Sequence, residues 1–118
     1  MPWYVHVAHF FGGAFLANAL PHLIAGVSGQ RLPTPFGSPP FEGLSSPTTN
    51  VVWALVNMAV AYVVLARVAA IDWQSSSDVG VAFIGFAAMA LQCARSLGRH
   101  RAAAPDESAQ RRGTGGRP

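Results

Sequence analysis

Lysine is missing from this sequence, and charged residues of any kind are scarce. They make up 11% of the 118 residues, against about 25% in an ordinary soluble domain. The helices of a soluble bundle need charged faces, so this composition argues against a soluble helical protein. All eight basic residues are arginines. One of them, Arg95, lies near the end of the last apolar stretch, and five more follow it in a segment rich in Gly, Ala, Ser and Pro. A nucleic-acid surface normally places basic residues on a folded platform, so we expect no nucleic-acid partner.

Cysteine and the usual catalytic motifs are also lacking. Cys93 stands alone, which excludes an internal disulfide and a CxxC metal site. The chain has no GxSxG, HExxH or Walker loop. Its five acidic residues are scattered outside the long apolar stretches: Glu42, Asp72, Asp78, Asp106 and Glu107. The sequence therefore predicts no enzyme, no catalytic residue, no metal site and no cofactor.

What the chain does contain is three long apolar stretches, at 3–27, 51–71 and 79–97. A helix needs about 20 mostly apolar residues to cross the hydrocarbon core of a bilayer. The first two stretches meet this length outright, and the third spans if Arg95 extends toward the headgroups. The sequence thus predicts an all-α fold: a bundle of three transmembrane helices, at about 3–27, 48–71 and 78–97. These helices form a membrane domain over 1–98, followed by a disordered basic tail over 99–118.

A proline-rich loop separates the first two helices. Five prolines between residues 30 and 49 exclude a regular helix there. Phe36 and Phe41 make the segment too apolar for a free linker, so we expect an ordered loop that packs over the helices or on the membrane surface. Ser46 followed by Pro47 is typical of a helix start. Ser77 or Asp78 is expected to cap the third helix.

The distribution of arginine predicts the orientation. Cytoplasmic segments of membrane proteins carry an excess of Lys and Arg, and most of the arginines here lie in the C-terminal tail. We therefore expect a cytoplasmic C-terminus, an external turn at 72–78, a cytoplasmic proline-rich loop with Arg31, and an external N-terminus. Arg67, near the outer end of the second helix, is the one exception.

Histidine and asparagine are the polar residues of the first helix. At about 100° per residue, His6 and His9 share one face, whereas Asn18 and His22 share another. Imidazole binds zinc, copper and haem iron, but no Cys, Asp or Glu within a span completes a ligand set. We favour structural hydrogen bonds for these residues. The alternative is a cofactor or small-molecule site formed by His22, Asn18 and Asn57 beneath the proline-rich loop.

Small and polar residues form a seam on each of the other helices. On the second helix they recur at spacings of four, three and four: Asn50, Ala54, Asn57 and Ala61. Gly85, Ala88 and Gln92 form a shorter seam on the third. Such faces let membrane helices approach closely and hydrogen-bond, and we expect Asn57 to lie near Asn18 or His22.

These seams predict a non-enzymatic membrane subunit that packs against the lipid bilayer and against itself or a larger complex. The alternative function is a membrane protein that binds a small molecule, a metal or haem through the His and Asn residues of the first helix.

One longer pattern resembles a known group of proteins. The helix carries His9, Asn18, Pro21 and His22, and the loop continues with Pro-Thr-Pro-Phe36 and Gly-Leu-Ser-Ser-Pro47. This run is similar to a pattern in small uncharacterised bacterial inner-membrane proteins, and it covers about residues 9–57. The resemblance implies a bacterial inner membrane and an ordered loop, and it brings no site residues with it.

Overall fold

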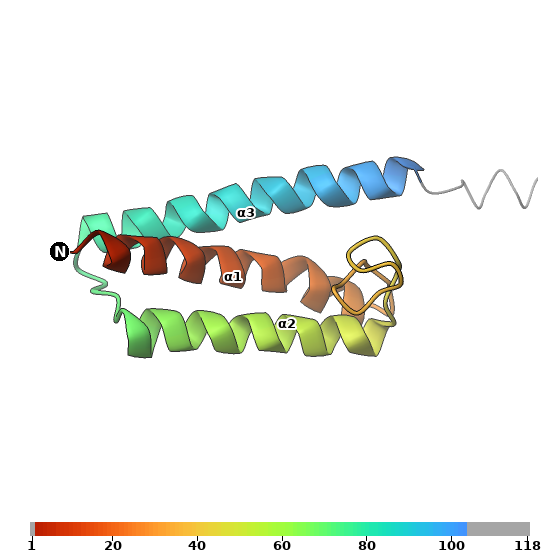
Figure 1. The fold of residues 1–118 in the computed structure, drawn as a ribbon, viewed down its shortest axis with the longest axis horizontal. Helices are drawn as coiled ribbons and strands as arrows, with labels where there is room; N and C mark the ends of the chain where they lie inside the picture. Colours follow the sequence, from red (N-terminus) through yellow and green to blue (C-terminus); the bar gives the residue numbers. More distant parts are fainter. Residues whose placement is uncertain (1, 104–118) are drawn as a thin grey trace, which may run out of the picture.

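The computed structural model describes residues 2–103, and these form a single layer of helices (Figure 1). The elements are α1 (Trp3–Val27), α2 (Pro47–Tyr62), the π-helical segment η1 (Val63–Val68) and α3 (Ser76–Ala103). Helix α1 lies between the other two; α2 and α3 each pack against it but do not contact each other. Three helical segments are long and apolar enough to cross a membrane, which confirms the predicted all-α, three-helix architecture.

The starts of α2 and α3 are both set by serine caps. The Ser46 hydroxyl accepts a hydrogen bond from the Thr49 backbone N–H at 3.1 Å, as predicted. At α3 the hydroxyl of Ser75 accepts from the Asp78 N–H at 3.3 Å, so the predicted cap at Ser77 or Asp78 is wrong. The Asp78 side chain is buried instead, with Oδ2 accepting from the Asp72 N–H at 3.1 Å.

Two helix ends differ from those expected. The second helix was expected to run to residue 71, but its last part is the π-helical segment η1, which ends at Val68. Such π-helical segments are rare in proteins, and those that occur often lie at functional sites. Helix α3 continues to Ala103, beyond the expected end at 97, because Ala, Leu and Arg all favour helix. The helical residues 99–103 thus correct the start of the predicted disordered tail; the rest of that tail lies outside the described residues.

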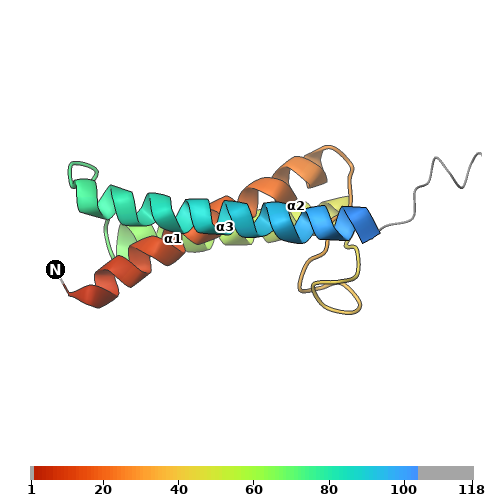
Figure 2. The same cartoon turned by 90° about the horizontal axis from the view of Figure 1, so that it is seen from above.

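Glycine allows α1 and α3 to cross in close contact. A Cβ atom added to Gly85 would collide with the carbonyl of Phe10, and one added to Gly13 would collide with the carbonyl of Ala82. Figure 2 shows that α1 crosses α3 at an angle, so the two helices separate on either side of this contact. The predicted small seam of α3 is therefore only partly used: Gly85 is buried, whereas Ala88 and Gln92 are exposed.

The proline-rich loop is ordered, as expected. Pro33 and Leu44 form an isolated antiparallel bridge, and the Ser45 N–H donates to the Leu32 carbonyl at 3.0 Å. The hydroxyls of Thr34 and Ser45, both buried, are hydrogen-bonded to each other. The loop thus closes upon itself at the end of the layer opposite the N-terminus (Figure 1).

Candidate metal centre

The polar residues of α1 belong to separate networks at different depths. Near the loop, Asn50 of α2 is fully buried, and its side-chain N–H group reaches three carbonyl oxygens at 3.0–3.2 Å, those of Leu32, Ser45 and Ser46. Because the amide nitrogen faces these acceptors, the opposite atom is Oδ1. His22 Nδ1 lies 2.7 Å from it and therefore donates a hydrogen bond. This network ties α1, the loop and α2 together.

The second network lies at mid-layer. The Asn18 amide donates to Oδ1 of Asn57 at 3.0 Å, and the Asn57 amide donates to the carbonyl of Trp53 at 2.8 Å. The predicted pairing of Asn57 with Asn18 is therefore confirmed. Of the three candidate ligand residues, the structure brings Asn18 and Asn57 together and places His22 against Asn50 instead.

The third cluster lies at the N-terminal end and joins α1 to α3. His6 and His9 project from successive turns of α1, their ring centroids 6.3 Å apart and their planes at 81°. Asp78 reaches the same point from the first turn of α3. One ligand atom from each of the three lies within 4.8 Å of the other two. His9 and Asp78 are both completely buried.

The proton on His9 can be placed from its hydrogen bond. Nε2 lies 2.9 Å from the carbonyl oxygen of Ala69, the residue that follows η1. A carbonyl oxygen only accepts, so Nε2 carries a proton. In the neutral ring Nδ1 then presents a lone pair, and it faces Oδ1 of Asp78 at 3.7 Å. With a neutral His9 ring, two buried hydrogen-bond acceptors, Nδ1 of His9 and Oδ1 of Asp78, thus face each other.

Three buried atoms at this end lack a hydrogen-bond partner: His6 Nδ1, His9 Nδ1 and Asp78 Oδ1. Among the side chains of residues 2–100, which the structure describes, they are the only buried nitrogen or oxygen atoms of which this is true. An unpaired buried polar group costs about 1–3 kcal/mol, and more when it is charged. The arrangement therefore favours a positively charged species between the three side chains.

No sequence motif indicates this cluster, but the topology of three spans does. Asp78 lies outside the apolar stretch, so a search for carboxylates within the spans passes over it. With three spans, however, the turn at 72–78 must return to the side of the membrane where the N-terminus lies. That places Asp78 level with His6 and His9. Helical spacing thus brings His6 and His9 onto one face of α1, and the topology of the chain brings Asp78 next to them.

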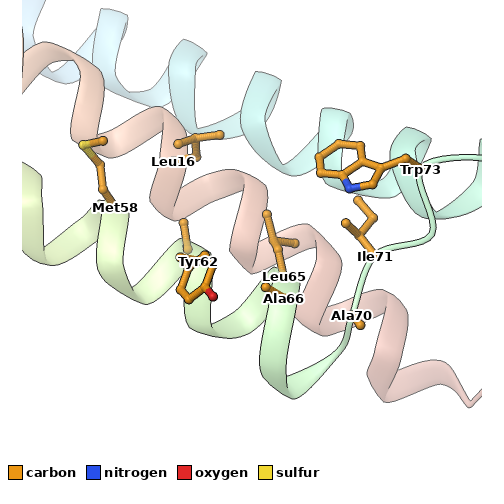
Figure 3. Close-up of a pocket in the computed structure, with 9 residues that line it drawn as sticks. Leu16, Met58, Tyr62, Leu65, Ala66, Ala70, Ile71 and Trp73 are labelled. Carbon is orange, nitrogen blue, oxygen red and sulfur yellow. The ribbon is translucent and has the colours of Figure 1, made fainter.

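An apolar hollow of about 500 Å³ lies beside the π-helical segment (Figure 3). Leu16 of α1, Tyr62 of α2 and Trp73 of the turn before α3 line it, with other apolar side chains. Specific small-molecule sites combine apolar walls with several convergent polar groups. This hollow has almost no polar lining, so its chemistry matches a lipid chain better than a polar ligand.

Comparison of the chain with protein-family models, with curated proteins and with solved structures found no match. The functional interpretation therefore comes from the chemistry of the residues themselves.

Proposed function

We propose that this is a non-enzymatic, multi-pass membrane protein that acts by association of its helices with a second copy of the chain. The observation that carries the proposal is the exposure of Gln92. His9, Asn50 and Asn57 are buried within the chain, and Asn18 is hydrogen-bonded to Asn57. Gln92 is exposed on a segment of α3 apolar enough to span a bilayer. A polar side chain in that position is costly against lipid and favours a protein partner.

The surroundings of Gln92 fit helix association. Ala88, Gln92 and Ser96 follow one another at four-residue spacing, and all three are exposed. Small residues at such a spacing let two membrane helices approach closely. A glutamine amide carries both donors and an acceptor, so two copies can pair with each other across a two-fold axis. This self-complementarity favours a second copy over an unrelated partner.

The test is mass measurement of the purified full chain in mild detergent, supported by sedimentation at several protein concentrations. We expect a dimer, and Gln92→Leu is expected to raise its dissociation constant about 3- to 20-fold. This corresponds to about 0.6–1.7 kcal/mol, from the average to the largest value measured for such hydrogen bonds in membranes. Gln74→Leu, in the exposed turn before α3, is the matched control and is expected to leave the dimer unchanged. A monomer at all concentrations would contradict the proposal.

We further infer a bacterial inner membrane, with the N-terminus outside and the C-terminus in the cytoplasm. The arginines near and beyond the end of α3, together with the resemblance over residues 9–57, support this. Reporter fusions at Ser75 and Ala103 test the orientation. We expect an external signal from Ser75 and a cytoplasmic one from Ala103, and an external signal from Ala103 would overturn it.

The alternative function is the binding of a ligand by the polar residues of α1. The two ends of α1 support this function to different degrees. His22 and Asn57 belong to separate networks, and their hydrogen bonds are already made within the protein. The histidines at the other end retain unpaired atoms. A binding role is therefore favoured there alone.

A further inference from the structure

We propose that His6, His9 and Asp78 bind one divalent transition-metal ion of the zinc class. This goes beyond the proposed self-association and does not depend on it, because Gln92 and the metal site lie on separate parts of α3. Two observations support this: each of the three residues has one buried side-chain atom without a hydrogen-bond partner, and one ligand atom of each lies within 4.8 Å of those of the other two. Two of these atoms, His9 Nδ1 and Asp78 Oδ1, belong to completely buried side chains.

The spacing of the ligand atoms suits an ion. Zinc binds histidine nitrogen and carboxylate oxygen at about 2.0–2.2 Å, so ligand atoms at a tetrahedral ion lie about 3.3–3.6 Å apart. His9 Nδ1 and Asp78 Oδ1 are 3.7 Å apart, close to this range. The largest separation in the cluster, 4.8 Å at most, requires a shift of about 1 Å. His6 is the least buried of the three residues, so rotation of its ring is the movement that would supply this shift.

Both buried ligands are held in place by a second hydrogen bond. A metal-bound histidine typically donates its other N–H to a carbonyl or carboxylate. His9 does so through Nε2 to the Ala69 carbonyl, which leaves Nδ1 as the ligand atom. The second oxygen of Asp78 accepts from the Asp72 N–H, which leaves Oδ1 free. The site is thus pre-oriented by α1, by α3 and by the segment between η1 and α3.

Charge selects the kind of ion. Among the described side chains, those of residues 2–100, His9 is the only one that could carry a positive charge within 4 Å of the Asp78 carboxylate. Burying an uncompensated carboxylate is expensive, and a divalent cation removes this cost. Two imidazoles and one carboxylate favour Zn²⁺, Co²⁺, Ni²⁺ or Cu²⁺ over Mg²⁺ and Ca²⁺, which prefer oxygen ligands. Three protein ligands also leave a fourth position for water or another group.

A proton is the competing occupant. If His9 is an imidazolium, it forms a buried ion pair with Asp78 and needs no metal. The two occupants differ in one measurable respect, because only the metal requires His6. A proton between His9 and Asp78 leaves the Nδ1 atom of His6 without a partner, whereas a metal ion uses all three residues.

The experiment uses the untagged full chain, purified in mild detergent and treated with a chelator. Zn²⁺ binding is followed by calorimetry, and Co²⁺ binding by its visible absorption, which reports the coordination geometry. We expect one ion per chain and a Co²⁺ spectrum of low-coordinate type. His6→Ala and Asp78→Asn are each expected to weaken binding more than about 100-fold, since even the loss of a group that orients a ligand costs about 10- to 100-fold.

Two matched controls separate this site from adventitious binding. Glu42→Gln removes an exposed carboxylate of the proline-rich loop, and His100→Gln removes a histidine near the far end of α3. Both are expected to leave the affinity and the spectrum unchanged. Asp78→Asn retains an acceptor for the Asp72 N–H, and circular dichroism is used to check that the variant folds. The proposal is overturned if the wild type binds no stoichiometric ion, or if His6→Ala and Asp78→Asn bind as the wild type does.

Discussion

The two ends of the helical layer handle buried polar groups in opposite ways. At the loop end, the Asn50 amide has carbonyl acceptors on one side and His22 on the other, and no described buried side-chain atom there lacks a partner. At the N-terminal end, His9 and Asp78 are equally buried but present two acceptors to each other. The two ends contain similar residues, because at each end a histidine of α1 faces a polar residue of another helix. The difference is that an amide can both donate and accept, whereas a carboxylate only accepts.

This contrast separates a structural network from a binding site. A network that satisfies every member stabilises a membrane protein and needs nothing further. A cluster that leaves acceptors facing one another is stable only with a cation or a proton in place. Substitutions at the loop end should therefore lower the stability of the protein strongly. Substitutions at the N-terminal end should change its stability little but weaken ion binding greatly.

The largest expected effect is at the loop end. Asn50→Leu removes the acceptor of His22 and the donor to the carbonyls of Leu32 and Ser45, leaving buried groups unpaired. We expect a loss of about 3 kcal/mol in the free energy of unfolding, at a cost of about 1–3 kcal/mol for each unsatisfied group. Unfolding by a denaturing detergent, followed by circular dichroism, measures this loss.

Asn57→Leu is the control for this comparison. It lies on the same face of α2 but takes part in the smaller mid-layer network with Asn18. Hydrogen bonds between membrane helices average about 0.6 kcal/mol, so we expect a much smaller loss than for Asn50→Leu. Equal losses at the two positions would show that the loop network contributes no more to stability than the mid-layer network.

The smallest expected change in stability is at the other end. In metal-free protein, Asp78→Asn removes a buried charge, retains an acceptor for the Asp72 N–H, and offers an N–H group to His9 Nδ1. We expect stability equal to that of the wild type or greater by up to about 1 kcal/mol, the usual contribution of one hydrogen bond. The same unfolding assay, with chelator present, checks the sign. A loss of more than about 1 kcal/mol would instead identify Asp78 as the structural partner of a protonated His9.

Much of the fold followed from short-range features of the sequence. The apolar runs determine three helices because a helix satisfies its own backbone in lipid. Ser46 and Pro47 determine where α2 begins, and the Asn50–Ala61 seam correctly indicates the face that packs on α1. The sequence placed Asn57 near Asn18 or His22, and the structure shows that Asn18 is its partner. The π-helical segment after Tyr62 had no corresponding signal in the sequence, because its apolar residues fit a regular helix equally well.

The remaining features required the tertiary structure, for a physical reason. The crossing angle of α1 and α3 decides that Gly85 is buried and Gln92 is not, and a hydrophobic pattern does not encode that angle. The same packing turns Asp78 inward, where a solvent-exposed helix cap was expected. The sequence by itself determined that this chain forms three helices that are long and apolar enough to cross a membrane and that carry isolated polar residues. Only the packing of those helices decided which polar residues satisfy each other and which are left to bind something else.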